Sequence, residues 1–547
     1  MKFKVILALA CLMLQCSIFA SCKDDEFKSQ NGTIIGDGNI DKNENDNNDE
    51  TEENTAVMTE TLQLYKYPDI IVEAGKLGHL KKSEVFNVSV IQENKEYDVY
   101  VMQDYNTLKA EGNSQAKNFM TTYNHTANFS FKNSVQVKVS RKDGGSMSNT
   151  VVYPKAKNYK YTVFGNDLLI TLDKWAYIYV QVPGLDDDPL FVFADPYEEN
   201  IPTLQDSEVL DAGMSIDEIK TKISNTSKGT IYFKPGVYSF GAQTNNTYPG
   251  YKIPIVSNKN YYIPGGAVII GSFSGESGAS NTKFYGRGVI TACGKERIAN
   301  TDGIPFNLYN VGGGTGNVIE GLQFNNPAHF CILSRGELTT QYTKMFGWWH
   351  QTDGWGAESN STIQDCFIKV NDDYIKIYRS NQIARNIVMY KQINGAGIQL
   401  GWGTYGAAQN GIIEDIYIVN EDAKTPGIGN TAVVDLMNNG GSEINNMRFK
   451  NFYIENKIQM FLCLNSNGGK LSNFTFENIY EQKGAYQPNN YIITQNSNKG
   501  TYENFEFINY FISDNKVLSE EDMNLKQGYA NDKKLVEDIK LVVPKFK

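Results

Sequence analysis

NVIEGLQF at residues 317–324 returns in altered form as STIQDCFI at residues 361–368 and as NQIARNIV at residues 381–388. Each unit places an apolar residue, then polar residues that often include Asn or Asp, and then another apolar residue. Further units follow along the chain: NGIIEDIY (410–417), SEINNMRF (442–449), KLSNFTF (470–476) and TYENFEF (501–507). Ile319 and Ile363 are 44 residues apart, or two turns of 22, and Ile383 follows 20 residues later. Short strands repeated at this period are typical of a solenoid.

We therefore expect an all-β chain in which residues 201–547 form a right-handed parallel β-helix. In such a solenoid each coil adds short strands to stacked sheets, and the bends between strands carry Gly, Asn and Asp. A β-propeller is the competing architecture, but it would need repeats of about 40 residues with four strands each. The capping box at residues 215–218 (SIDE) predicts a helix start, and this helix could cover the open end of the solenoid.

The region before the repeats reads as short strands of alternating polarity. Clear cases are residues 86–90 (FNVSV), 97–101 (YDVYV), 135–139 (VQVKV) and 168–172 (LLITL). A chain of 547 residues is too long for one compact core. We expect a β-sandwich over residues 61–200, without a catalytic grouping of its own.

The N-terminus has the pattern of a bacterial export signal. Lys2 and Lys4 precede an apolar run, and residues 19–22 (FASC) resemble a lipobox. We expect a lipoprotein-type signal peptide over residues 1–21 and lipidation of Cys22, with an ordinary cleaved signal peptide as the alternative. Residues 22–60 are acidic and polar, as in a disordered tether. Residues 22–26 (CKDDE) also resemble the surface-export signal of Bacteroidota lipoproteins, so we expect an outer-membrane lipoprotein of a Gram-negative bacterium, surface-exposed or periplasmic.

The charge balance argues against a polyanionic partner. The formal net charge is −11, of which residues 23–60, with 12 acidic and 3 basic residues, hold −9. Lys2 and Lys4 add +2, so residues 61–547 carry −4. A body without a basic field does not attract nucleic acid, anionic lipid or an acidic glycan. We expect a neutral polysaccharide as the partner and contact with a membrane only through the lipid anchor.

Cysteine usage gives no sign of a metal site. Four of the seven cysteines lie beyond residue 60: Cys293, Cys331, Cys366 and Cys463. They are widely spaced, without a CxxC or Cys/His pattern, so we expect buried apolar residues and no metal or other cofactor.

Three aspartates are the candidate catalytic groups. Asp353 stands in QTDG (351–354), and Asp372, 19 residues later, is followed by Asp373 in NDDYIKIY (371–378). This interval is close to one turn of the repeat, and stacked strands lie about 4.8 Å apart. Glycosidic hydrolysis needs one carboxyl group to protonate the leaving oxygen and another to activate water, about 6.5–9.5 Å apart in inverting enzymes and about 5–5.5 Å apart in retaining ones. Because adjacent strand residues point to opposite faces, one of the pair could instead cap a turn.

Seven neighbouring residues are candidates for binding a sugar: Trp348, Trp349, His350, Lys376, Tyr378, Gln399 and Trp402. Tryptophan rings stack on the apolar faces of sugars, and burial in the core is the alternative for each of them. Lys376 could hold a carboxylate ionised or bind a hydroxyl, and Tyr378 shares its strand face. His350 could line the groove, although a structural hydrogen bond is the more common role of such a residue.

QTDG (351–354), VNDDYIKIY (370–378) and QLGW (399–402) together resemble glycoside hydrolase family 49, the family of dextranase and isopullulanase. The resemblance also covers FADP (193–196) and the order of sandwich and β-helix. It implies a catalytic β-helix that hydrolyses an α-glucan with inversion, usually by internal cleavage of α-1,6 bonds in dextran. Carried over by motif, Asp372 is the general acid, and Asp353 and Asp373 hold and activate the water.

Other functions compete with this expectation. An isopullulanase-like or other neutral-glycan hydrolase would use the same groups. A polygalacturonase-like β-helix enzyme also uses three aspartates, but it carries Gly-His-Gly and basic residues, whereas residues 401–403 read GWG here. A non-catalytic surface glycan-binding protein would suit the lipid anchor, but binding does not require three carboxylates at this spacing.

Overall fold

The computed structural model describes residues 58–75, 78–110, 112–239, 252–292, 307–403, 406–424, 430–437, 443–495, 497–531, 534–537 and 539–547. The predicted signal peptide, the lipidation site Cys22, most of the acidic tether and Cys293 lie outside these residues. Within the described ranges, no helix combines the length and the apolar character needed to cross a bilayer. Strands dominate the described chain, which confirms the predicted all-β class.

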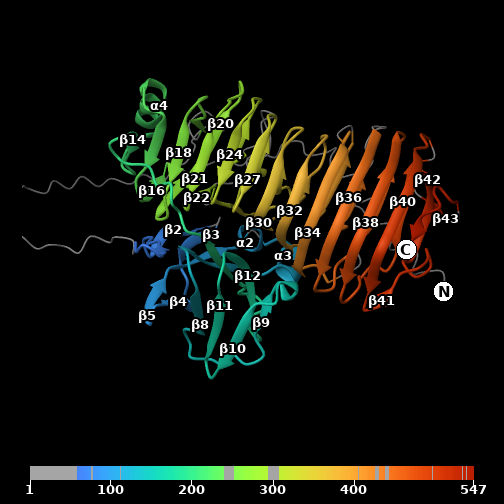
Figure 1. Ribbon diagram of the computed structural model, residues 1–547, viewed down its shortest axis with the longest axis horizontal. Helices are drawn as coiled ribbons and strands as arrows, with labels where there is room; N and C mark the ends of the chain where they lie inside the picture. Colours follow the sequence, from blue (N-terminus) through green and yellow to red (C-terminus); the bar gives the residue numbers. More distant parts are fainter. Residues whose placement is uncertain are drawn as a thin grey trace, which may run out of the picture. The chain divides into compact units, whose positions relative to one another are not determined.

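A β-sandwich of two sheets comes first (Figure 1). In spatial order its larger sheet contains β2 (Ile70–Gly75), β3 (Gly78–Lys82), β6 (Val101–Tyr105), β7 (Tyr123–Phe131), β13 (Leu190–Pro196), β12 (Ala176–Gln181) and β9 (Val151–Tyr153), with β1 (Leu62–Leu64) paired to β7. Its smaller sheet contains β10 (Lys160–Phe164), β11 (Asp167–Leu172), β8 (Val135–Arg141), β4 (Phe86–Gln92) and β5 (Lys95–Val99). Alternate residues of both sheets, such as Val90 and Ile178, are buried between them.

The connections of the sandwich contain short helical turns: α2 (Thr107–Ala110), α3 (Ser114–Phe119) and η2 (Lys155–Lys157). The expected single strand over residues 97–101 is wrong. β5 ends at Val99 in the smaller sheet and β6 begins at Val101 in the larger one, so the chain crosses between the sheets at Tyr100.

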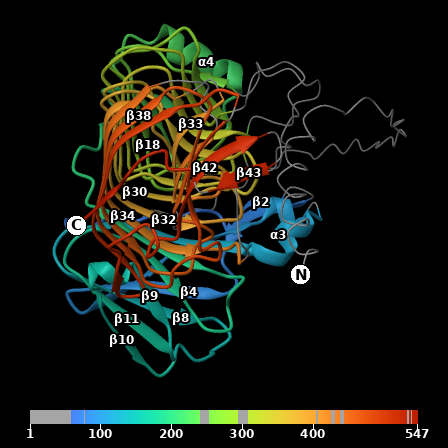
Figure 2. The ribbon, with the colours of Figure 1, turned by 90° about the vertical axis from the view of Figure 1, so that its right-hand side faces the viewer.

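The remaining strands stack as coils of a parallel β-helix, which confirms the predicted architecture (Figure 2). Within the described residues one sheet of 19 strands contains β14 (Ser207–Leu210), β15 (Thr230–Phe233), β16 (Gly236–Ser239), β18 (Asn260–Ile263), β19 (Ala267–Ile270), β21 (Lys283–Gly286), β22 (Val289–Thr291), β24 (Asn317–Glu320), β25 (Gln323–Asn325), β27 (Leu338–Gln341), β28 (Lys344–Phe346), β30 (Thr362–Lys369), β32 (Ile383–Lys391), β34 (Gln409–Glu421), β36 (Glu443–Ile454), β38 (Lys470–Glu481), β40 (Thr501–Ile512), β41 (Asn515–Lys516) and β44 (Lys545–Phe546). We call this the long sheet.

The second sheet of the β-helix has 12 strands within the described residues: β17 (Lys252–Pro254), β20 (Ser272–Gly275), β23 (Tyr309–Val311), β26 (Phe330–Ser334), β29 (Asp353–Gly356), β31 (Ile375–Lys376), β33 (Ile398–Trp402), β35 (Val434–Met437), β37 (Leu462–Ser466), β39 (Asn490–Gln495), β42 (Leu525–Asn531) and β43 (Lys534–Glu537). We call this the site sheet. Apolar side chains of both sheets fill the interior between them.

The Asn and Asp of the repeat units make the bends of the coils. Asp365, Asn386 and Asp415 have φ angles of 55°, 51° and 58°, the left-handed region that Asn and Asp tolerate better than other non-glycine residues. Their side chains also bond along the stack. The Asn386 amide donates to Asp365 at 2.6 Å, and the Asn451 amide donates to Asp415 at 2.8 Å. Equivalent bends of neighbouring coils are therefore bonded to one another along the stack.

The helix predicted from the capping box is α4 (Ile216–Asn225). The Ser215 hydroxyl accepts a hydrogen bond from the Glu218 backbone, and Glu218 reaches back to the Ser215 backbone. Ile219 and Ile223 are fully buried in the same cluster as residues of the first coils. The helix therefore covers apolar surface at the beginning of the solenoid, as expected.

Candidate active site

The three candidate aspartates lie on adjacent coils of the site sheet. Asp353 is the first residue of β29, and Asp372 and Asp373 come just before β31, in which Ile375 pairs with Trp355 of β29. One oxygen of each carboxylate lies within 4.8 Å of the other two. Stacking of coils thus brings together groups that are 19 and 20 residues apart in the sequence.

Asp373 is surrounded by hydrogen-bond donors. Its Oδ1 accepts from the backbone N–H of Ala396 at 3.1 Å and from Nδ2 of Asn430 at 2.8 Å, and its Oδ2 accepts from Nζ of Lys376. The residue is 3% exposed. Three donors, one of them charged, compensate a negative charge at this buried carboxylate.

Asp353 lies beside the same lysine. Its Oδ1 accepts from the backbone N–H of Asp373 at 3.1 Å and lies 3.3 Å from Nζ of Lys376, while its Oδ2 lies 3.9 Å from Nε2 of His329. Burial raises the pKa of Asp353 to about 7, and the Lys376 ammonium opposes this shift. Asp353 therefore changes its protonation state near neutral pH.

Asp372 faces different surroundings, because its side chain is partly exposed. Burial, followed by the negative charges of Asp373 and Asp353, raises its pKa well above that of an ordinary aspartate. A carboxyl group with such a raised pKa keeps its proton near neutral pH and can donate it. The two adjacent aspartates therefore differ, because Asp372 has a raised pKa and Asp373 accepts three hydrogen bonds.

The carboxylates are closer together than the expected arrangement of an inverting pair. Their nearest oxygens lie within 4.8 Å, whereas acid and base are commonly about 6.5–9.5 Å apart in inverting glycosidases. The spacing alone would therefore not have assigned the stereochemical course. Asp353 and Asp373 are buried beside the partly exposed Lys376, and Asp372 is the more accessible acid.

The support of Asp373 includes residues that sequence reasoning missed. Asn430 lies 57 residues beyond Asp373, and no motif marks it. The expected direct contact between Gln399 and substrate is wrong, because Gln399 is fully buried. Its Nε2 donates to Oδ1 of Asn430 at 2.6 Å, and its Oε1 accepts from the backbone N–H of Gly401 at 2.8 Å. Gln399 thus orients the amide that holds Asp373.

The three predicted tryptophans have different surroundings. Trp348 is fully buried among Leu108, Ala116 and Met120 of the sandwich, and its Nε1 donates to Asp104 at 3.2 Å. Its predicted role in stacking on a sugar is therefore wrong. Trp349 is half-buried against the same cluster. Trp402 is 46% exposed at the end of β33, so its ring is free to meet a sugar.

The two remaining candidates lie near the aspartates in different settings. Tyr378 is partly exposed, with Nζ of Lys376 5.4 Å from its ring centroid. Burial raises the pKa of Tyr378, so its hydroxyl remains a neutral donor. His350 is half-buried, and its Nε2 lies 3.1 Å from Nδ2 of Asn113 in the sandwich. This contact is the structural hydrogen bond that the sequence left as the alternative for His350.

A Ser–His–Asp arrangement occurs in the sandwich, at positions that sequence reasoning did not single out. The Ser83 hydroxyl lies 2.9 Å from Nδ1 of His125, and Nε2 of His125 lies 3.1 Å from Asp188. Ser83 and His125 are buried, and Ser83 also accepts from the backbone N–H groups of Val85 and Phe86. A nucleophile must reach its substrate, so this group is structural.

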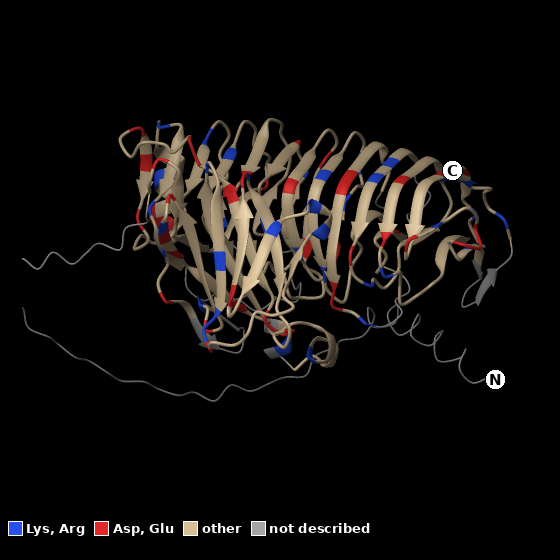
Figure 3. Ribbon diagram, turned by 60° about the horizontal axis from the view of Figure 1, so that its bottom comes forward, with Lys and Arg blue, Asp and Glu red and all other residues tan. Residues whose placement is uncertain are grey.

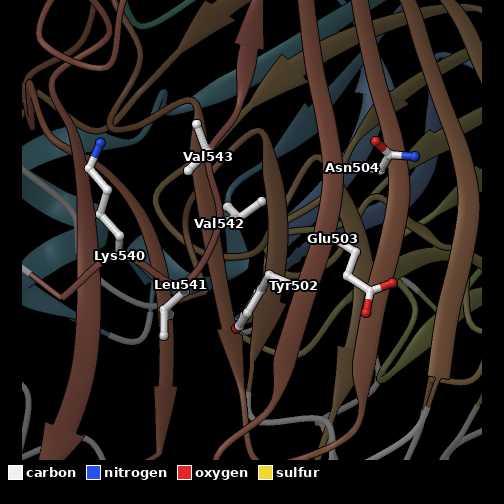
Figure 4. A pocket seen from close by; sticks show the side chains of 7 residues that line it. All are labelled: Tyr502, Glu503, Asn504, Lys540, Leu541, Val542 and Val543. Carbon is white, nitrogen blue, oxygen red and sulfur yellow. The ribbon is translucent and has the colours of Figure 1, made fainter.

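A hollow at the C-terminal end of the β-helix lacks the set of carboxylates that glycosidic hydrolysis needs. It is lined by Tyr502, Glu503, Asn504, Lys540, Leu541, Val542 and Val543 (Figure 4). It offers one carboxylate, too few for acid–base hydrolysis. Along the described strands, acidic and basic residues are interspersed (Figure 3).

Comparisons with known proteins agree with the geometry. No family model matches the sequence. Isopullulanase from Aspergillus niger is 24% identical over 410 residues, which cover 66% of this chain and 69% of that protein. A dextranase from Arthrobacter sp. (strain CB-8) is 26% identical over 272 residues, 43% of this chain and 41% of that protein, so the aligned part is less than half of either. Among solved structures, Dex49A from Penicillium minioluteum has a TM-score of 0.64 at 17% identity, covering 85% of this chain and 95% of that one. This structural likeness shows a shared fold.

Proposed function

We propose, on the premise that this chain is a relative of the isopullulanase and dextranases of glycoside hydrolase family 49, that it is a glycoside hydrolase acting on an α-glucan. Internal cleavage of α-1,6 bonds in dextran is the favoured reaction. The observation that carries the proposal is the difference in environment between the two adjacent aspartates. Asp372 has a raised pKa and is partly exposed, whereas Asp373 accepts hydrogen bonds from three donors.

In the proposed mechanism Asp372 protonates the glycosidic oxygen as the bond to the leaving sugar breaks. Asp353 and Asp373 hold the attacking water and accept its proton, and Lys376 compensates the negative charge that they share. Trp402, exposed beside these groups, is the candidate stacking surface for a neighbouring sugar ring. Activity is expected to rise with pH through about 7 as Asp353 ionises, and to fall at higher pH as Asp372 loses its proton.

The substrate and stereochemistry are tested together. Purified protein is incubated with dextran, pullulan, an α-1,3-glucan and polygalacturonate, and new reducing ends are measured. Proton NMR during the first turnover then identifies the anomer. Inversion at an α-linkage releases a β-anomer, and chromatography of the products separates internal from terminal cleavage. Release of an α-anomer would contradict the inverting scheme, and binding of glucans without new reducing ends would favour a glycan-binding protein.

Pullulan hydrolysis is the second candidate. It is favoured by one observation, since isopullulanase gives an alignment of 410 residues and the dextranase above one of 272. Cleavage of pullulan at a higher kcat/KM than dextran would select this candidate, and it would leave the proposed roles of the three aspartates unchanged.

The role of Asp372 has a direct test with a matched control. Asp372→Asn keeps the side-chain size but removes the proton donor, so kcat is expected to fall by about 10²–10⁴-fold. Asp365→Asn is the control, because Asp365 bonds Asn386 at a bend of the long sheet, where asparagine fits equally well. Both variants should keep the native far-ultraviolet circular dichroism. An active Asp372→Asn enzyme would contradict the assignment.

We further propose that the protein is an outer-membrane lipoprotein anchored through Cys22 and exposed at the cell surface. The support is the sequence alone: the lipobox-like FASC and the acidic segment after it. Labelling with an alkyne fatty acid in the native host should mark the wild type and not Cys22→Ala. Added protease should degrade the wild type on intact cells. A labelled protein that resists protease until the cells are lysed would place the lipoprotein in the periplasm.

A further inference from the structure

We infer that Lys391 is a positioning residue for the proposed catalytic group, because one buried ammonium fixes the segments that carry both uncharged donors to Asp373. The inference rests on the proposed function. Lys391 ends β32 of the long sheet and is fully buried. It does not approach the reacting carboxylates itself, so its action on them passes through other residues.

The Lys391 ammonium has three partners, as many as it has protons. Nζ donates to the backbone oxygen of Gly395 at 2.9 Å and to that of Thr431 at 3.3 Å, and it pairs with Oε1 of Glu421 at 3.4 Å. The two oxygens lie 36 residues apart in the sequence. Lys391 therefore ties together two loops on consecutive coils beside β31.

The first contact acts through a single peptide group. The oxygen of Gly395 and the N–H of Ala396 belong to the same planar unit, and in a trans peptide they point in opposite directions. Lys391 bonds the oxygen, and Asp373 accepts the N–H at 3.1 Å. Fixing one end of the unit fixes the direction of the other, and a cation on the oxygen strengthens the N–H as a donor.

The second contact anchors the segment that carries Asn430. Lys391 bonds the oxygen of Thr431, the next residue, and the N–H of the same peptide group, on Ala432, donates to Asp435 at 3.4 Å. Asn430 then donates from Nδ2 to Asp373 at 2.8 Å. The peptide between Thr431 and Ala432 is thus held on both sides, and the side chain of Asn430, one residue earlier, reaches the proposed catalytic group.

Packing stability alone does not account for the choice of a lysine here. Burying an ammonium and a carboxylate costs free energy, and well-packed apolar residues often replace such pairs without loss of stability. Lys391 and Glu421 are 0% and 3% exposed. The position gains directional bonds to two loops, which an apolar side chain cannot supply.

The test uses the double variant Lys391→Met/Glu421→Gln, in which no carboxylate is left unpaired, beside Lys391→Met. Lys344→Met is the matched control. Lys344 is also a buried lysine bonded to a carboxylate and a backbone oxygen, but its partners are Asp195 and Gly321, away from the three aspartates. Melting temperatures, kcat and KM as functions of pH, and crystal structures are measured for all variants.

A positioning role predicts a specific pattern of change. In the double variant kcat falls about 10- to 100-fold, the size expected for a small misplacement of a catalytic group. KM stays within about twofold, since substrate contacts remain. The acidic limb of the kcat profile, which the ionisation of Asp353 sets, moves to higher pH, because the negative charge of Asp373, now less compensated, raises the pKa of Asp353 further. Lys344→Met lowers the melting temperature but does not move this limb.

A crystal structure of the double variant decides the inference independently of activity. We expect Ala396 N and Asn430 Nδ2 to move out of hydrogen-bond distance of Asp373. Retention of both bonds, or an unchanged pH profile in an active double variant, would overturn the positioning role. If the wild type cleaves none of the glucans, the proposed function fails, and the two bonds to Asp373 still decide whether Lys391 positions them.

Discussion

At the scale of single residues, the close approach of the next coil to the backbone of Asp372 depends on one glycine, Gly395. Gly395 has a φ of +84°, and a Cβ at this position would lie 2.0 Å from the carbonyl carbon of Asp372. The coil that carries Gly395 therefore approaches Asp372 more closely than any residue with a side chain would allow. The same glycine presents its oxygen to Lys391.

Gly395→Ala is expected to impair catalysis more than folding. The new methyl group must displace the Asp372 backbone, and the left-handed φ adds strain of about 1 kcal/mol. We expect kcat to fall at least about tenfold, with a modest loss in melting temperature. Gly403→Ala is the control, since Gly403 also has a positive φ (+57°) but its Cβ would meet nothing within 4 Å. Equal kcat in both variants would contradict the close-approach argument.

Two tryptophans on the list of predicted sugar-binding residues should give opposite phenotypes. Trp402→Ala removes an exposed ring, so KM should rise while the melting temperature stays unchanged. Trp348→Ala leaves a cavity beneath the loop that leads to Asp353 and should destabilise the protein by about 3–5 kcal/mol. Thermal unfolding and steady-state kinetics of both variants check this. A raised KM in Trp348→Ala without loss of stability would restore the original expectation.

The proximity of the three candidate aspartates could be predicted from the sequence, because the coil period itself places residues 19 apart side by side. Trp348 could not be assigned, since its burial depends on Leu108 and Met120 from another domain. Asn430 was missed for a related reason: its amide reaches Asp373 across 57 residues, and no local pattern encodes the contact. Local periodicity therefore predicts neighbours on stacked coils, but not contacts made by loops.

At the scale of the element, several long strands of the long sheet bend at an Asn or Asp within them, as β30 does at Asp365 and β32 does at Asn386. The repeat units predicted these bends, because Asn and Asp tolerate the left-handed conformation. The strand ends also bury acids that no motif marks. Glu481 ends β38, is 3% exposed and accepts a hydrogen bond from the Tyr510 hydroxyl. Burial raises its pKa to about 7.

Glu481 should make the protein less stable as the pH rises. Its folded-state pKa lies above the value of 4.5 for a free glutamate, so the folded chain binds its proton more tightly. The stabilisation that this tighter proton binding gives the folded chain is complete below about pH 4.5 and is lost as the pH rises through about 7. Glu481→Gln keeps the acceptor for Tyr510 but cannot ionise, and it should gain up to about 3 kcal/mol over the wild type at pH 8 and little at pH 4.5. Denaturant unfolding at both pH values checks this, and equal stabilities at pH 8 would contradict the buried ionisation.

At the scale of the whole molecule, the sandwich packs against the outer face of the long sheet. Phe191 and Phe193 of β13 lie in one buried cluster with Phe346, Phe367 and Tyr390 of the β-helix. The sequence predicted a sandwich and a solenoid but not this contact, because the continuous apolar run of β13 does not reveal which partner covers its second face. The sandwich therefore supports coils close to the three candidate aspartates, and a second contact comes from Asn113, the N-cap of α3, whose Nδ2 lies 3.1 Å from Nε2 of His350.

A buried charge network around Asp195 joins the sandwich to the β-helix. Asp195 of β13 is fully buried and accepts from Lys344 Nζ at 2.5 Å and from the Tyr177 hydroxyl at 2.6 Å, with Arg287 Nε at 3.6 Å. Asp195→Ala would leave Lys344, whose pKa burial already lowers to about 8, without its carboxylate. We expect a loss of about 3–5 kcal/mol.

Because the partners of Asp195 belong to both domains, the wild type should unfold in one cooperative transition, and Asp195→Ala should lower it as a whole or split it in two. Differential scanning calorimetry separates these outcomes. Asp143→Ala is the control, since Asp143 pairs with Arg141 on the surface of the sandwich and its loss should leave the transition unchanged. If Asp195→Ala melts like the wild type, the charge network does not join the domains, and apolar packing around Phe191 and Phe193 alone holds the sandwich against the catalytic coils.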